Sequence, residues 1–375
     1  MNNKLFSKIY GCEAAATIAN SMGDVTEGFT YMEIEERWGF VDQLLEQNKF
    51  GRDNTIADRR RPQPYGPDFV YHGHFRPPGM TEDGHERHRL CSSAIIRKGG
   101  RIDIYDLADT WVKDIDPSKF GYILGPQDQV ILNSIKAGIP PWEIGKFATY
   151  PSKIGTAKMI LPVGMVNACN PDRAAQDAFD LGRIKDVRGV PDNFSLEACA
   201  AVAAACAEAM KPASTIDSVI DAALFYLSKF PKKEVELGLS WAKNADSWKD
   251  IRPLYEEKYH PYNASNAVEV LSGALACFYI ANGNPRDAIL YSVNLGRDCD
   301  CRAYIAGGLT AAMKGIEEVP ADWVKVVEEQ VVTDPYTVST RTARETALGI
   351  YNAAIKTMDE MSASLSLLKE LVKPK

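Results

Sequence analysis

Apolar residues recur along this chain at spacings of three and four, whereas alternation of apolar and polar residues with a period of two is nearly absent. Such spacing places side chains on one face of a helix, so the pattern predicts an all-α fold. The predicted helices span residues 11–22, 30–47, 81–98, 104–116, 127–135, 171–182, 195–210, 215–229, 232–242, 263–281, 285–295, 301–314, 321–330 and 338–370.

Two segments interrupt the helical pattern. Residues 51–80 contain five prolines and the run Arg59-Arg60-Arg61, and residues 139–170 are rich in glycine, proline and small residues. Long irregular segments inside a compact helical domain are usually functional loops or disordered. With no repeat, low-complexity linker or domain boundary in view, we expect one compact orthogonal helical domain over residues 1–375, ending in a C-terminal helix within 338–375.

The C-terminal helix carries an apolar stripe that includes Leu348, Met358, Met361, Leu365 and Leu368. We expect this stripe to contribute to the core, and an interface between copies of a homo-oligomer is the alternative.

Composition and charge exclude some classes of function. The 375 residues carry a net charge of −7, so no basic field would hold nucleic acid, and no apolar run of 18 residues would cross a membrane. Lys8 and Glu13 interrupt the apolar N-terminal segment, which argues against a signal peptide. The eight cysteines are scattered in apolar surroundings and are expected to be buried free thiols, as in a cytoplasmic protein.

Asp298 and Asp300 alternate with Cys299 and Cys301 just before an almost uncharged segment. In a turn, carboxylates two residues apart can point to one centre, and two like charges beside a buried helix need a cation or an arginine. We therefore favour a metal site over a solvated turn. A zinc or redox site built on the cysteines is a weaker alternative, because a C-x-C pair without a second pair or histidines is not typical of zinc.

A second cluster contains Thr81, Glu82, Asp83 and Glu86. Thr81 is expected to cap the following helix while the carboxylates face a cation, although acids at a helix start also occur without one. His85 and His88 in the same charged stretch are expected to be surface residues.

A third candidate is the turn predicted around Asp24 and Glu27. Glu27 is the better site residue, because the neighbouring glycines let backbone and substrate come close.

In this order, and on a helical chain, the three clusters resemble the ADP-ribosylglycohydrolase family, and we identify the chain as a divergent relative. The counterparts of the family motifs are Ala19-Asn20-Ser21-Met22-Gly23 followed by Glu27, then Thr81-Glu82-Asp83-Gly84, and finally Gly296-Arg297-Asp298-Cys299-Asp300-Cys301. The similarity covers roughly residues 10–330. The loop Lys153–Met159 is similar to the substrate-binding loop of the family.

The resemblance implies a glycoside hydrolase with two Mg2+ ions, with Mn2+ and Ca2+ as alternatives. It implies metal ligands at Thr81, Glu82, Asp83, Asp298, Asp300 and Cys301. It further implies catalytic roles for Glu27, Asp83 and Asp298, and substrate contacts from Gly155, Thr156 and Arg297. Residues 51–80 and 139–170 would then be active-site loops.

Asn20, Glu82, Gly84, Arg297 and Cys301 depart from the family motifs. Arg297 suggests a substrate anion different from that of the main family. The leading hypothesis is a Mg2+-dependent hydrolase that cleaves an ADP-ribosyl or related ribosyl N- or O-glycosidic bond, free or protein-linked. The alternative is a catalytically altered protein that binds such a ligand or serves a structural role.

Overall fold

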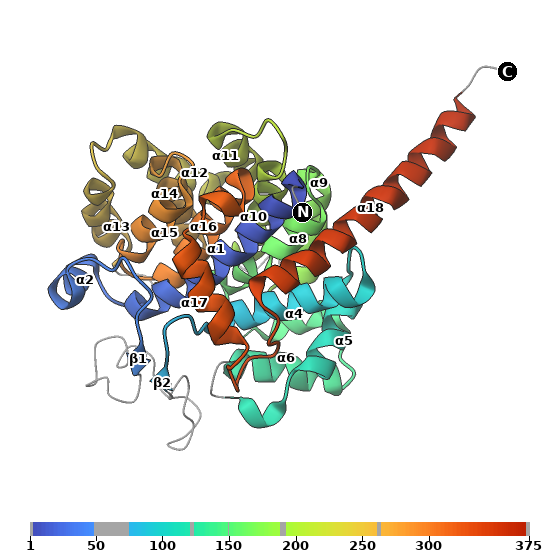
Figure 1. Cartoon of the computed structure of the whole chain (residues 1–375), viewed down its shortest axis with the longest axis horizontal. Helices are drawn as coiled ribbons and strands as arrows, with labels where there is room; N and C mark the ends of the chain where they lie inside the picture. The colour runs from blue at the N-terminus through green and yellow to red at the C-terminus, as the bar shows by residue number, and fades with distance from the viewer. Residues whose placement is uncertain are drawn as a thin grey trace.

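The computed structural model describes residues 3–48, 75–120, 124–148, 150–187, 193–260 and 264–372. These residues are mostly helical, which confirms the all-α prediction (Figure 1). A short antiparallel pair, β1 (Gln47–Asn48) and β2 (Phe75–Arg76), is the exception among them.

The α-helices of the described part are α1 (Lys4–Thr26), α2 (Tyr31–Trp38), α4 (Asp83–Lys98), α5 (Ile104–Asp114), α6 (Pro126–Lys136), α7 (Pro141–Ile144), α8 (Leu161–Val166), α9 (Pro171–Gly182), α10 (Ser195–Ala209), α11 (Ile216–Phe225), α12 (Lys229–Asn244), α13 (Ile251–Tyr259), α14 (Ala267–Ile280), α15 (Pro285–Val293), α16 (Cys299–Lys314), α17 (Ala321–Val331) and α18 (Ala343–Leu371). The 3-10 turns are η2 (Pro117–Lys119), η3 (Gly145–Phe147), η4 (Ile154–Met159), η5 (Trp248–Asp250) and η6 (Ile316–Glu318).

Helices α1 and α16 lie side by side at the centre of the molecule (Figure 1). Glycines permit this close approach. A Cβ atom at Gly23 would lie 2.4 Å from Cα of Asp300, and one at Gly11 would lie 2.7 Å from the carbonyl carbon of Gly315. The end of α1 is thereby placed against the start of α16.

Several predicted boundaries are wrong. The helix predicted over 30–47 ends at Trp38, before Gly39 with φ of +69°. Helix α4 begins at Asp83, and its N-cap is Glu82 rather than Thr81. Helix α16 begins at Cys299, two residues before the predicted start.

The segment 139–170, predicted to be irregular, contains four short helical pieces, α7, η3, η4 and α8. Residues 49–74, which hold most of the other predicted loop and Arg59–Arg61, lie outside the described residues.

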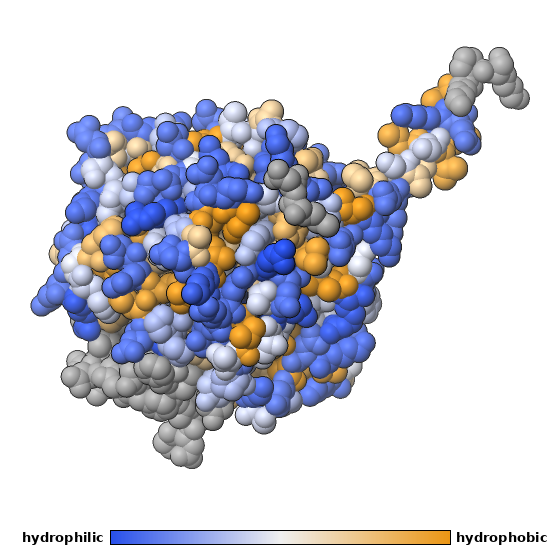
Figure 2. Space-filling view, viewed as in Figure 1, coloured by the Kyte–Doolittle hydropathy of each residue, from blue (hydrophilic) through white to orange (hydrophobic). Residues whose placement is uncertain are grey.

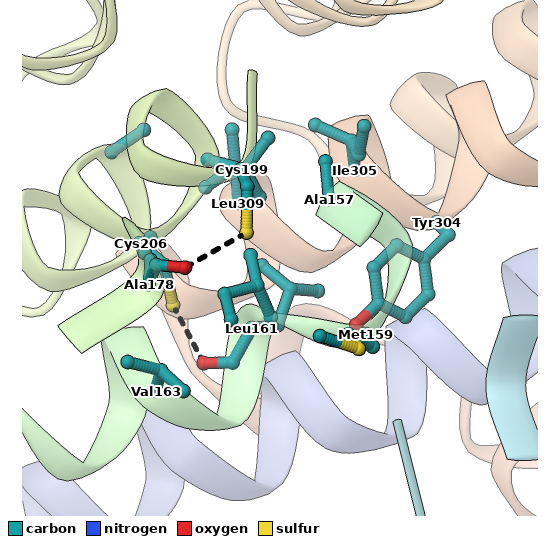
Figure 3. Packing of buried hydrophobic residues seen from close by; sticks show 14 of the residues in the cluster. Ala157, Met159, Leu161, Val163, Ala178, Cys199, Cys206, Tyr304, Ile305 and Leu309 are labelled. Carbon is teal, nitrogen blue, oxygen red and sulfur yellow. Dashed lines mark hydrogen bonds between the residues drawn. The ribbon is translucent and has the colours of Figure 1, made fainter. Parts of the chain in front are cut away.

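The chain from η4 to α8 is packed in the core. Ala157 and Met159 have no exposed surface, and they lie close to Tyr304, Ile305 and Leu309 of α16 (Figure 3). Further along, the Cys206 thiol of α10 donates to the carbonyl of Leu161 at 3.6 Å. The backbone on both sides of residue 158 is therefore fixed by apolar contacts.

The distal half of α18 projects away from the rest of the molecule (Figure 1). Met358, Met361, Leu365 and Leu368 are 41–60% exposed, and orange apolar surface is visible on this part of the helix (Figure 2). The prediction that this stripe belongs to the core is wrong for these residues. No described helix is long and apolar enough to cross a membrane.

Candidate functional site

Asp298 and Asp300 lie at the start of α16. Asp298 is the N-cap, and its Oδ1 accepts from the backbone N–H of Cys301 at 3.2 Å. Asp300 stands in the first helical turn rather than in a turn before the helix, yet oxygens of the two carboxyl groups still lie within 4.8 Å of each other. Oδ2 of Asp298 and Oδ1 of Asp300 are buried and receive no donor from the described residues.

Glu82, the N-cap of α4, faces the same centre from the other side. Asn20 of α1 accepts from the Glu82 backbone N–H at 2.9 Å and donates through Nδ2 to the Glu82 carboxylate. The same carboxylate also accepts from the backbone N–H of Gly84 at 3.1 Å. These contacts fix the carboxylate of Glu82 next to α16.

Lys158 of η4 occupies the space between the two acidic groups. Its ammonium donates to both Oε1 of Glu82 and Oδ2 of Asp300. The Lys158 side chain is only 1% exposed. Lys158 lies in the loop that resembles the substrate-binding loop of the family, but the sequence predicted no role for this residue.

Burial raises the pKa values of the Glu82 and Asp300 carboxyl groups well above the usual range, and the charge of Lys158 opposes this effect. Burial alone would lower the pKa of Lys158, but the charges around it, with Asp300 foremost, raise it well above its usual value. Lys158 therefore remains an ammonium ion.

The other residues predicted as metal ligands on or beside α4 also have protein partners. Asp83 pairs with Arg87 at 2.7 Å, and Arg87 in turn pairs with Asp128 of α6 at 2.6 Å. The hydroxyl of Thr81 lies 3.5 Å from Oε1 of Glu86. Each predicted ligand from α4 thus has a donor or acceptor within the chain.

Glu27 follows the last residue of α1, and its charge contributes to raising the pKa of both Asp298 and Asp300. Glu27 is half-buried, whereas Asp298 and Asp300 are at most 1% exposed. Glu27 is therefore the most accessible member of this group of three carboxylates.

Arg297 has a left-handed backbone with φ of +68°, and its N–H donates to the carbonyl of Phe29 at 2.6 Å. Its guanidinium donates to the buried carboxylate of Glu269 at 2.5 and 3.0 Å. The structure thus directs Arg297 to α14, and its predicted contact with substrate stays a prediction.

Gly155 and Thr156 lie in η4, just before Lys158. The Thr156 hydroxyl donates to Asp186, and Thr156 is fully buried. A Cβ atom at Gly155 would lie 3.2 Å from Cε of Lys185. These two residues precede Lys158, which bonds to the acidic centre formed by Glu82, Asp298 and Asp300. Their predicted contact with substrate also stays a prediction.

His85 and His88 are buried, so the prediction that they lie on the surface is wrong. Their rings stack at 4.7 Å, and His88 lies 2.8 Å from the Glu13 carboxylate and 2.6 Å from the Tyr304 hydroxyl. Asp24, placed by the sequence in a turn, lies within α1 and pairs with buried Arg76 at 2.6 Å.

Within the acidic centre, one position fits a metal ion and a neighbouring position does not. Potential ligand atoms of Asp298, Asp300 and Cys301 lie within 4.8 Å of one another, and two carboxylate oxygens there lack a donor. Hard ions such as Mg2+ accept such oxygens, whereas the Cys301 thiol is a poor ligand for them. Between Glu82 and Asp300, by contrast, the Lys158 ammonium occupies the position that a second ion would need.

The geometry can be compared with known proteins. A family model for ADP-ribosylglycohydrolase matches residues 1–356. A solved structure described as an ADP-ribosylglycohydrolase-related protein complex covers 94% of this chain and 99% of its own, with a TM-score of 0.62 and 15% identity. No curated protein matches the chain. Since the family match spans all three acidic motifs and nearly the full length, the chain belongs to the ADP-ribosylglycohydrolase family.

Proposed function

We propose that this protein hydrolyses the glycosidic bond of an ADP-ribosyl or related ribosyl N- or O-glycoside. The observation that carries the proposal is the convergence of Glu27, Asp298 and Asp300 where the end of α1 meets the start of α16. Membership of the ADP-ribosylglycohydrolase family supports hydrolysis as the class of reaction.

The chemistry requires negative charge and a proton acceptor. Breaking the bond at ribose C1 develops positive charge on the sugar, and an attacking water must lose a proton. We assign the proton acceptor to the half-buried Glu27, which is the more accessible of the three carboxylates. In their ionised form, the buried carboxyl groups of Asp298 and Asp300 supply the negative environment that stabilises the sugar cation.

Asp298 and Asp300 would hold a single divalent ion, because Oδ2 of Asp298 and Oδ1 of Asp300 receive no donor from the described residues. When bound there, it would supply a Lewis acid that orients the substrate. Asp83 is tied to Arg87 and is assigned to positioning of the site rather than to proton transfer.

A protein that binds a ribosyl ligand without cleaving it is the second candidate. Lys158 neutralises part of the charge of Glu82 and Asp300, and Arg87 does the same for Asp83. In this case ADP-ribose would raise the melting temperature, and no product would form during long incubation.

The test is release of sugar from ADP-ribosyl-arginine, ADP-ribosyl-serine and ribosyl nucleosides. For any substrate that is cleaved, Glu27→Gln and Asp298→Asn should each lower kcat/KM by about 100-fold or more. Glu36→Gln, on the exposed face of α2, is the matched control and should leave the rate unchanged. Cleavage that is unaffected by Glu27→Gln and Asp298→Asn would refute the assignment, and absence of product from every substrate would favour the binding protein.

A further inference from the structure

The ammonium of Lys158 is held as an internal cation between carboxylates from two different helix starts. Glu82 caps α4, Asp300 stands in the first turn of α16, and the carboxylates of both accept from the same Nζ atom of Lys158. All three side chains are at most 4% exposed. A bridge between two buried carboxylates is the coordination that a metal ion would otherwise provide.

The path of the lysine side chain depends on Gly84. A Cβ atom at this position would lie 2.2 Å from Cδ and 2.5 Å from Cε of Lys158. Any larger residue would therefore collide with the aliphatic stem. The first turn of α4 is shaped to let Lys158 reach the acidic centre.

The backbone of η4 also holds Lys158 in place. Its neighbours Ala157 and Met159 are fully buried in the apolar core, as Figure 3 shows from close by. The lysine therefore cannot withdraw from the site without disturbing the core. Its ammonium is therefore a fixed part of the acidic centre and does not belong to a flexible surface side chain.

From these contacts we infer that Lys158 replaces a divalent ion between Glu82 and Asp300, so that this centre accepts no more than one divalent ion, at Asp298 and Asp300. A second ion would lie in contact with the ammonium, and the two like charges would repel strongly in a buried site. This inference concerns the same site as the proposed function, and it rests on that function for what the acidic centre does. Lys158 acts as a positioning residue that holds two carboxylates together.

The experiment compares the metal-stripped wild type with Lys158→Met, which keeps the aliphatic stem and removes the charge. Calorimetric titration with Mg2+ and Mn2+ counts the ions, and thermal unfolding follows the stabilisation that they produce. We expect the variant to bind one more ion per chain than the wild type. We also expect saturating Mg2+ to raise the melting temperature of Lys158→Met more than that of the wild type, by roughly 3–5 °C at a hundredfold excess over Kd.

Lys8→Met is the matched control. Lys8 is a half-buried lysine of α1 whose ammonium donates to the carbonyls of Ala209 and Lys211 at 2.8 and 3.0 Å. This substitution removes a hydrogen-bonded ammonium group but leaves no empty position between two carboxylates. It should lower stability but leave the number of bound ions unchanged.

A second variant, at Gly84, tests whether displacement of the Lys158 side chain allows a second ion to bind. Gly84→Ala should displace the stem of Lys158 and produce a gain in Mg2+ binding, whereas Gly100→Ala should not, because the nearest atom to its Cβ lies 3.9 Å away. Two ions bound by the wild type would overturn the inference. Equal ion counts in the wild type and both site variants would also overturn it and leave Lys158 a purely structural residue.

These readouts do not depend on turnover. If ion counts change as expected while no substrate is cleaved, the proposed hydrolysis fails and the role of Lys158 stands. If the wild type cleaves a ribosyl glycoside but binds two ions, the proposed function stands and the inference about Lys158 fails.

Discussion

Lys185 is a second buried lysine beside the acidic centre, and its surroundings differ from those of Lys158. Its ammonium donates to the amide oxygen of Gln127 at 2.6 Å rather than bridging two carboxylates. Burial lowers the pKa of Lys185 to about 8. The charged groups that act on it are, in order of effect, Arg87, Asp186, Asp128 and Asp83.

This pKa predicts a dependence of stability on alkaline pH. Between about pH 8 and pH 10.5 the unfolded chain binds a proton that Lys185 has lost in the folded state, so the free energy of unfolding should rise with pH in this window. The total contribution is about 3 kcal/mol. In Lys185→Met, urea unfolding at several pH values should show a smaller rise. Exposed Lys146→Met is the control, and equal slopes in the two variants would contradict the prediction.

At the scale of single residues, the sequence predicted the carboxylates of the acidic centre but not Lys158, the cation that pairs with them. Asp298 and Asp300 form a local motif, whereas Lys158 lies 76 residues from Glu82 and 142 from Asp300 along the chain. Nothing local distinguishes Lys158 from a surface lysine. The prediction for His85 and His88 failed for a related reason, because the charged stretch that contains them is buried by pairing between charged groups such as Arg87 and Asp128.

Among the elements, the contact of α1 with α16 controls the geometry of the acidic centre. It brings Glu27 of the first motif to Asp298 and Asp300 of the last, while Asn20 in the same helix bonds to Glu82. Close approach requires Gly23, whose added Cβ would meet backbone atoms of α16 rather than a side chain that could move.

We therefore expect Gly23→Ala to lower the free energy of unfolding by about 1–3 kcal/mol through overpacking. Gly100→Ala, which meets no atom closer than 3.9 Å, should change it by less than about 0.5 kcal/mol. Denaturant unfolding monitored by circular dichroism measures both. An equal effect of the two substitutions would show that α1 can move away from α16 without cost.

The sequence predicted which segments form helices better than it predicted where each helix begins and ends. Periodicity located most of the observed helices, including the long central ones, because their apolar faces follow the helical repeat. Helix α13 and the short pieces between residues 141 and 166 were missed, since their few residues show no clear period. The early end of α2 depends on a left-handed Gly39, which the apolar spacing does not reveal.

For the whole molecule, α18 divides into two parts. Its proximal turns are anchored by buried residues such as Ala347 and Ile350, whereas every described side chain from Met358 onward is exposed. The apolar distal stripe is visible on the projecting helix in Figure 2.

We expect truncation after Asp359 to leave the melting temperature nearly unchanged, because the removed residues bury little surface. By contrast, Ile350→Ala should cost about 2–5 kcal/mol, since it opens a cavity in the core. Thermal unfolding with mass measurement by light scattering tests both. A clear fall in the melting temperature and in the particle mass after truncation would show that the distal stripe is covered by another copy in solution.

The steric relation between Gly84 and Lys158 also constrains the order in which these positions could have changed. A side chain larger than glycine at position 84 and a lysine reaching the centre from position 158 exclude each other. A lineage that shortened residue 158 first would have removed this collision before residue 84 became larger. The reverse order passes through a chain with a collision in its first α4 turn, so substitutions at the two positions are expected to show strong sign epistasis.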